Sequence, residues 1–337
     1  MILPRGDLTI LFNALWDTDS RRISVKHPAE ELGELFEITL GEASASSIRT
    51  TLDEEDYSEA RRAIDQAHGE PAVTEIPEVS SYVNAFLAGG LLAPKNDEEI
   101  AEFIEREGHA DLSAGHQPVV AGFDTNLMAW RIANVLGLDP GPDAAINGFV
   151  VATGVLDELD WNKKRTNTKP LERAFGSTFS EFFNQPAGWR REGRLGETYY
   201  RGLRDHRYAD EVLSEPGDEE IVSALADYQT ENRKTVLLFS NDRDFIERAK
   251  SHRVRAQRVT FPQSLPRRVE GSWQVILDTL YILTVLFGVL ELPKVTLYGV
   301  WSGKGGQAWH DEALKCDCRS PKVESLIQRD VRILNFV

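Results

Sequence analysis

Short apolar runs that end next to acidic residues, and that alternate with helix-like segments, constrain the fold of this chain most strongly. Four strand-like runs occur, at residues 118–123, 145–151, 235–239 and 254–261, and acids follow the first and the third. Alternation of this kind predicts a parallel sheet whose strands are buried on both faces. Asp124 directly follows the first run, and Asp242 follows the third. Both acids are therefore expected at the carboxyl edge of the sheet, where open α/β sheets place their sites.

The rest of the chain has a different pattern on each side of this α/β region. Helix-like segments precede it, at residues 29–37, 53–67, 78–92 and 97–107. A long apolar helix at about 272–290 follows it, and then a hairpin that is expected to turn at 303–306. We therefore expect three regions. Residues 1–115 form a mainly helical N-terminal region, and residues 263–337 form a C-terminal helix-hairpin extension. Between them, residues 116–262 form a three-layer α/β/α domain with a central parallel sheet and an insertion at about 165–212.

The charge of the chain limits its partners. Its formal net charge is -16, from 54 acidic residues against 38 Lys and Arg. Because phosphate binding needs positive charge, a protein that coats nucleic acid generally is excluded, and any nucleic-acid surface must be a local patch.

The cysteines and the apolar runs indicate a reducing, aqueous compartment. Cys316 and Cys318 are too close together for a disulfide framework, and they make a weak zinc motif. The N-terminus lacks the charged start and apolar run of a secretory signal. The most apolar run, at 279–290, is too short to span a bilayer. We therefore expect a cytoplasmic protein without a membrane partner.

Four acids occupy defined places in the α/β pattern. Besides Asp124 and Asp242, Glu158 lies in the helix after the second run, and Asp218 begins a later helix. Right-handed crossovers can bring these positions to one cleft. Clustered carboxylates repel one another without a counter-charge, but they supply the oxygen ligands that Mg²⁺ prefers. Two bound ions could activate water for phosphodiester hydrolysis. Taken singly, each acid could instead cap a helix or face solvent.

The segments that carry these acids resemble the PIN-domain nucleases over about residues 117–262. They are Phe123-Asp124-Thr125-Asn126, Val155-Leu156-Asp157-Glu158-Leu159, Gly217-Asp218-Glu219-Glu220-Ile221 and Ser240-Asn241-Asp242-Arg243-Asp244-Phe245. The resemblance implies a metal-dependent endoribonuclease that cuts single-stranded RNA with Mg²⁺ or Mn²⁺. It implies that the catalytic metal ligands are Asp124, Glu158, Asp218 and Asp242, and that Asp244 is an accessory metal-binding acid. The residues that would orient these acids are Thr125, Asn126 and Ser240.

A basic and aromatic stretch lies in the long interval between Glu158 and Asp218. Residues 189–208 carry six Arg against three acids, with a Trp and three Tyr among them. Arginine binds phosphate and aromatic rings stack on unpaired bases, so this composition suits single-stranded RNA. The alternative is an ordinary helix with its aromatic side chains turned to the core. The RNA-binding residues expected here and just after Glu158 are Arg190, Arg191, Arg194, Tyr199, Tyr200, Arg201, Arg204, Lys163 and Lys164.

Two other functions fit the same residues. A non-catalytic RNA-binding or assembly module would use some of the acids only as helix caps. A metal-dependent phosphatase would act on a small substrate. The regions outside the α/β domain could serve a homodimer or a regulatory protein partner, and a second basic stretch at 248–268 could contact phosphate or an acidic subunit.

Overall fold

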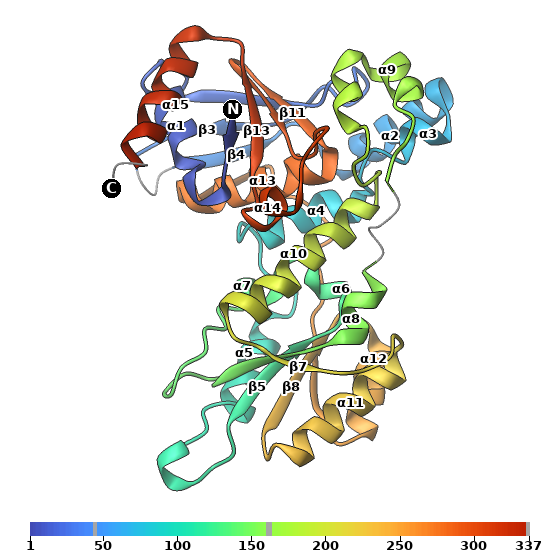
Figure 1. The fold of residues 1–337 in the computed structure, drawn as a ribbon, viewed down its shortest axis with the longest axis vertical. Coiled ribbons are helices and arrows are strands. Elements are labelled where there is room, and N and C mark those ends of the chain that lie inside the picture. The colour runs from blue at the N-terminus through green and yellow to red at the C-terminus, as the bar shows by residue number, and fades with distance from the viewer. Residues whose placement is uncertain (43–45, 160–163, 335–337) are drawn as a thin grey trace. The chain divides into compact units, whose positions relative to one another are not determined.

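The computed structural model describes residues 1–42, 46–159 and 164–334, and these divide into two compact units (Figure 1). Unit 1 comprises Met1–Leu91, Asn162–Arg191 and Gln263–Val337, and unit 2 comprises Leu92–Trp161 and Glu192–Pro262. Each unit is therefore assembled from segments that are far apart in the sequence.

Unit 2 is built on a parallel sheet. Among the described residues its five strands follow the order β7-β6-β5-β8-β9. They are β5 (Val119–Phe123), β6 (Gly148–Ala152), β7 (Asp210–Val212), β8 (Thr235–Ser240) and β9 (Arg255–Arg258). The central strands are almost wholly buried because their sequences are continuous apolar runs. In the central pair, β5 and β8 run in register from Val119 opposite Thr235 to Phe123 opposite Phe239.

The helices of unit 2 connect these strands. They are α5 (Asp97–Glu107), α6 (Thr125–Met128), α7 (Ile132–Val135), α8 (Thr153–Glu158), most of α10 (Arg190–His206), α11 (Asp218–Glu231) and α12 (Arg243–Ser251). The mixed α/β class and the parallel sheet are thus confirmed, whereas the three-layer arrangement stays a prediction. Strand β7 lies within the expected insertion, where its three residues gave no strand pattern.

Unit 1 is built on a sheet in which the described strand pairs are antiparallel. Its eight strands, counted over the described residues, follow the order β1-β13-β12-β11-β2-β3-β4-β10. They are β1 (Ile2–Leu3), β2 (Arg22–Lys26), β3 (Glu34–Thr39), β4 (Ser46–Thr50), β10 (Arg268–Gly271), β11 (Val289–Leu292), β12 (Val295–Tyr298) and β13 (Leu314–Cys318). Strands from both terminal regions therefore share one sheet, although the three-part division of the chain itself stays a prediction.

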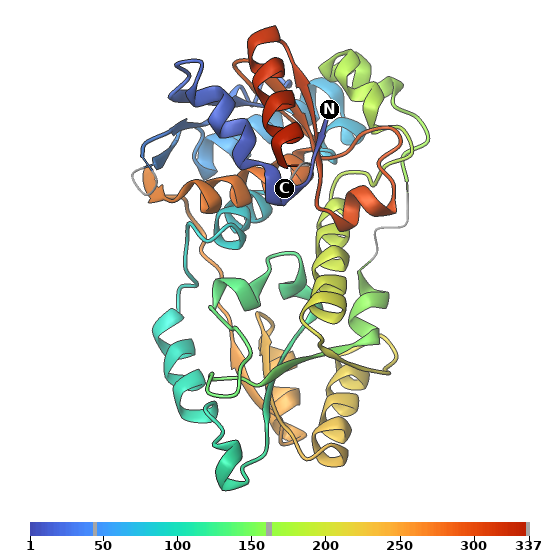
Figure 2. The same cartoon turned by 60° about the vertical axis from the view of Figure 1, so that its left-hand side comes forward.

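The helices of unit 1 also come from both ends of the chain. They are α1 (Thr9–Trp16), α2 (Glu54–His68), α3 (Glu70–Val73), α4 (Val79–Ala88), α9 (Lys169–Phe175), α13 (Trp273–Phe287), α14 (Gly306–His310) and α15 (Pro321–Leu334). Helix α15 lies against α1, so the first and last helices are neighbours (Figure 1 and Figure 2).

Two expectations for the terminal regions were wrong. Residues 29–37, expected as a helix, contribute instead to β3, which pairs with β2 and β4. Residues 34–37 join β3 because they pair with the strands on either side of it in the sequence, and this pairing overrides the helix-like local pattern. After α13, the strand β12 pairs antiparallel with β13 as a hairpin would, but the tight turn expected at 303–306 is absent because these residues lead into α14, and the short turn lies instead between β11 and β12.

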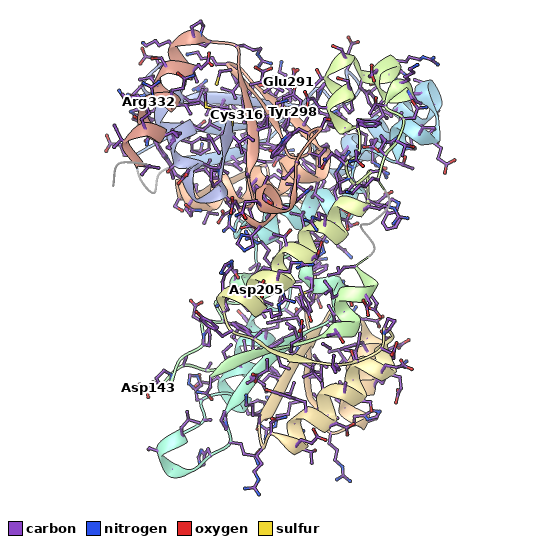
Figure 3. All side chains as sticks on the ribbon, in the orientation of Figure 1. Asp143, Asp205, Glu291, Tyr298, Cys316 and Arg332 are labelled. Carbon is purple, nitrogen blue, oxygen red and sulfur yellow. The ribbon has the colours of Figure 1, made fainter. Side chains whose placement is uncertain are left out.

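The apolar segment near 272–290 forms α13 as expected, and its side chains are largely buried in unit 1. Cys316 and Cys318 lie on β13 (Figure 3), and in the described part of the chain neither forms a disulfide. Among the described helices, none combines the length and the apolar character needed to cross a membrane.

Candidate active site

The carboxyl ends of β5 and β8 bring Asp124 and Ser240 into contact. Since Phe123 lies opposite Phe239, the next residues, Asp124 and Ser240, lie side by side at the ends of these two strands. The Ser240 hydroxyl donates to Asp124 Oδ2 at 2.5 Å, and Asn126 Nδ2 donates to the same oxygen at 2.6 Å. The Thr125 backbone N–H donates to Asp124 Oδ1 at 2.6 Å. These donors hold the carboxyl of Asp124, which is only 5% exposed, in one orientation.

Glu158 links two loops at the same edge. It is the last residue of α8, and its Oε2 accepts a hydrogen bond from the Thr125 hydroxyl. Its Oε1 accepts from the Gly217 backbone N–H at 2.8 Å, directly before Asp218 at the start of α11. Asp157, which competes with Glu158 in the sequence, is exposed. The hydrogen bonds thus favour Glu158 as the acid of α8 that belongs to the site.

A close backbone approach supports this link. The first turn of α8 contains Gly154, whose N–H donates to Ser214 Oγ at 2.9 Å. A Cβ atom at Gly154 would lie 2.2 Å from the Glu215 carbonyl oxygen. Only glycine therefore lets the segment before Asp218 pack on α8.

Asp242 and Asp244 lie at the start of α12 and are exposed. Asp242 is the N-cap residue, and its Oδ1 accepts from the Asp244 backbone N–H at 2.7 Å. The Asp242 backbone N–H donates to Ser240 Oγ at 2.9 Å, so Ser240 contacts both Asp124 and Asp242. The cap bond uses one of the two carboxylate oxygens of Asp242, so the same side chain can act as a ligand as well as a cap.

Electrostatic interactions join the acids into one cluster. Burial raises the pKa of Asp124 to about 6, against the lowering effect of its hydrogen bonds, and the charges of Asp218 and Glu158 add to the rise. Burial also raises the pKa of Asp218, where Arg248 opposes the rise and Asp242, Glu158 and Asp244 add to it. Asp218 therefore lies within electrostatic range of the other four acids expected as ligands, and Thr125, Asn126 and Ser240 contact Asp124 or Glu158.

Arg248 is a neighbour of the acids that was not among the expected site residues. It lies on α12, it lowers the pKa of Asp218, and its Nη1 is 3.5 Å from Glu219 Oε2. The signal for it in the sequence was the basic stretch at 248–268. A cation beside a carboxylate cluster can contact the phosphate of a substrate.

The donor set suits a hard divalent cation. All of the expected ligands are carboxylates, and their charges mutually disfavour ionisation of Asp124 and Asp218. Within residues 1–42, 46–159 and 164–334, no group of three or more His, Cys, Asp or Glu side chains is arranged so that it could hold a metal ion. The fit of these residues to a cation rests on their chemistry, namely oxygen donors and a local excess of negative charge.

The raised pKa of Asp124 predicts how pH affects the metal-free protein. Between pH 3.8 and about 6 the folded state holds a proton that the unfolded state has lost. The associated stabilisation is fully present below pH 3.8 and is lost as the pH rises through about 6, a change of about 3 kcal/mol. In urea unfolding with EDTA, the Asp124→Asn variant should gain stability relative to wild type over this range. A difference between the two proteins that does not vary with pH would contradict the assignment.

Four of the residues expected to bind RNA are buried, which corrects that expectation. They are Arg191, Arg194, Tyr199 and Tyr200, with exposures of 0%, 8%, 8% and 0%. The reason is that α10 is amphipathic and its aromatic face packs on the core, as in the alternative interpretation. The Tyr199 hydroxyl donates to Asn134, and the Arg194 guanidinium pairs with Glu197.

The other residues expected to bind RNA have varied positions. Arg201 is exposed and pairs with Glu197 at 2.8 Å, and Arg204 pairs with Asp205 at 2.6 Å. Lys164 and Arg190 lie at the surface of unit 1. Lys163 lies outside the described residues.

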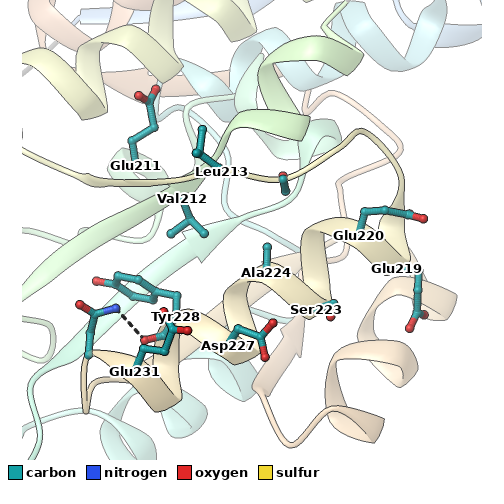
Figure 4. A pocket seen from close by; sticks show the side chains of 12 residues that line it. Glu211, Val212, Leu213, Glu219, Glu220, Ser223, Ala224, Asp227, Tyr228 and Glu231 are labelled. Atoms are coloured by element: carbon teal, nitrogen blue, oxygen red, sulfur yellow. Dashed lines mark hydrogen bonds between the residues drawn. The ribbon is translucent and has the colours of Figure 1, made fainter.

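Unit 2 contains a cavity of about 710 Å³ that is lined by residues of β7, of α11 and of the segment between them (Figure 4). Its lining includes the acids Glu211, Glu219, Glu220, Asp227 and Glu231. Because these carboxylates repel phosphate, an RNA strand is not expected to follow this face of α11.

The comparison with protein families agrees with the motifs. Residues 123–260 match the family model described as PIN domain, which covers less than half of the 337 residues. This segment contains all five acids of the cluster. No curated protein matches the chain. The resemblance to the PIN domain, a family whose members are usually nucleases, is therefore confirmed over residues 123–260.

Proposed function

We propose that this protein is a metal-dependent endoribonuclease that hydrolyses phosphodiester bonds of single-stranded RNA. The observation that carries the proposal is the acidic cluster at the carboxyl edge of the parallel sheet. In it, Asp124 is oriented by Ser240 and Asn126, and burial, with a smaller contribution from neighbouring acids, raises its pKa. The match of residues 123–260 to the PIN domain adds support.

The ligands we propose for Mg²⁺ or Mn²⁺ are Asp124, Glu158, Asp218 and Asp242, with Asp244 as an accessory acid. A bound cation would supply Lewis-acid activation of water and of the phosphate. Ser240 and Asn126 would keep the Asp124 carboxylate oriented toward the cluster. Thr125 and the Gly217 N–H would do the same for Glu158.

Arg248 would hold the phosphate of the strand near the acids, since its positive charge already acts on Asp218. Arg201, which is exposed on α10, is a second candidate for phosphate contact. The buried members of the expected RNA-binding set are left out of this proposal.

The test is cleavage of a circular single-stranded RNA by the full chain, with Mg²⁺, with Mn²⁺ and with EDTA. We expect linear products with either metal and none with EDTA, because only internal cleavage opens a circle. Binding of the RNA without cleavage would indicate the non-catalytic module instead. Hydrolysis of a generic phosphomonoester without cleavage of RNA would indicate a phosphatase.

A further inference from the structure

A cavity of about 450 Å³ in unit 1 combines positive charge with an exposed aromatic ring. Two segments of the chain line it, residues 164–167 and 187–190, together with Thr74 and Glu75. Trp189 is 55% exposed, although a side chain of its size is usually covered in a folded unit. An exposed indole at the wall of a polar cavity is a surface on which a planar ligand can stack.

The charge of this cavity is opposite to that of the chain as a whole. Among its described lining residues, Lys164, Arg165 and Arg190 are cationic and Glu75 is anionic. Glu75 is fully buried and is paired with both Arg165 and Arg191, so its charge is compensated within the protein. A positive cavity in a chain with a net charge of -16 favours an anionic ligand.

The backbone holds the aromatic and cationic side chains at this place. Gly188 has φ +43°, and a Cβ atom there would lie 1.8 Å from the Thr74 carbonyl oxygen. The loop before Trp189 therefore packs directly on the neighbouring backbone. The guanidinium of Arg190 lies 4.3 Å from the centroid of the Trp189 ring. On the opposite segment, Lys164 forms a backbone bridge with Pro186.

We propose that this cavity binds one unpaired nucleotide, with its base stacked on Trp189 and its phosphate held by Lys164 and Arg190. Aromatic rings stack on bases of any sequence, and cationic side chains beside them bind the phosphate. A free nucleotide and a nucleotide within an RNA strand share this chemistry. Its lining residues 164–167 and 187–190 fall within the matched residues 123–260 but belong to unit 1, whereas the acidic cluster belongs to unit 2. Binding in this cavity requires no cleavage.

The experiment is isothermal titration calorimetry of the full chain in EDTA, which prevents metal-dependent cleavage. The probes are adenosine 5′-monophosphate, a short single-stranded oligoadenylate and inorganic phosphate. Trp189→Ala should weaken nucleotide binding roughly 5- to 150-fold, the range expected for loss of one base–aromatic stack. Trp189→Phe should retain most of the affinity because it keeps an aromatic face.

Matched variants separate the cavity from general charge effects. Arg190→Ala should weaken binding, whereas Arg21→Ala should not, although Arg21 also lies 4.3 Å from a tryptophan ring, that of Trp16. Lys164→Ala should likewise weaken binding, and Lys322→Ala, at an exposed position on α15, should not.

The probes also distinguish the two sources of the ligand. If Trp189→Ala weakens the binding of both adenylates, a free nucleotide can fill the site. If it weakens the binding of the oligoadenylate alone, the site takes a nucleotide within a strand. The proposal is overturned if inorganic phosphate binds as tightly as both adenylates, or if the variants of the cavity bind them like wild type. Either failure would leave the RNA cleavage assay, and hence the proposed nuclease activity, unaffected.

Discussion

Asp124→Asn is expected to reduce metal-dependent RNA cleavage on the order of 10³-fold without reducing the stability of the fold. The change removes the buried negative charge that we propose as a ligand, and a bound metal contributes several kcal/mol to such reactions. The amide oxygen can accept from Ser240 and Asn126 as Oδ2 does now, whereas the amide nitrogen leaves the Thr125 N–H without its acceptor, a loss of about 1 kcal/mol. Burial no longer opposes ionisation at this position, so the free energy of unfolding at pH 7 should be equal or higher. Single-turnover cleavage rates and urea unfolding measure the two effects.

A pair of helix-capping acids provides the control. Asp242 caps α12 and Asp53 caps α2, each by accepting backbone N–H bonds. Asparagine caps a helix about as well as aspartate, so neither Asp242→Asn nor Asp53→Asn should change stability by more than about 1 kcal/mol. Only Asp242→Asn should impair cleavage. Equal cleavage by both variants would assign Asp242 to capping alone.

Glu75→Gln is expected to lower the free energy of unfolding by about 3–5 kcal/mol. The side chains of Glu75 and Arg191 are both 0% exposed, and Arg165 pairs with the same carboxylate. Removing the negative charge while keeping the size of the side chain leaves the buried Arg191 guanidinium uncompensated. Urea unfolding of the full chain measures the loss.

Glu78→Gln is the matched control for this prediction. Glu78 pairs with Arg61, but its side chain is 63% exposed. Solvent screens such a pair, so the expected loss is at most about 1 kcal/mol. If both variants lose the same stability, burial does not set the strength of the Glu75 pair.

The α/β part of the fold was predictable because each of its central strands has a recognisable pattern within a few consecutive residues of the sequence. The apolar runs that became β5 and β8 are continuous, and acids follow them at the sheet edge. The contacts of Asp124 with Ser240 follow from parallel pairing of those two strands. By contrast, β2 pairs with β11 through Lys26 and Glu291, which are far apart in the sequence, so the sheet of unit 1 was not predictable from local patterns.

The basic stretch at 189–208 shows a different limit. Its composition suits RNA, but composition does not give the direction in which each side chain points. Once α10 forms, helical periodicity turns Arg191, Tyr199 and Tyr200 toward the core. Arg190 stays at the surface beside Trp189, and Arg248 reaches the acids from another element. These outcomes depend on tertiary packing that one sequence does not contain.

The most direct test of the metal-dependent site is anomalous X-ray scattering from crystals of the full chain grown with MnCl₂. We expect a manganese peak at ligating distance, roughly 2.0–2.3 Å, from a carboxylate oxygen of Asp124 and of at least one other acid of the cluster. The same crystals of the Asp124→Asn variant should show a weaker peak or none. Manganese bound only elsewhere, or equal peaks in wild type and variant, would show that the proposed metal site is wrong.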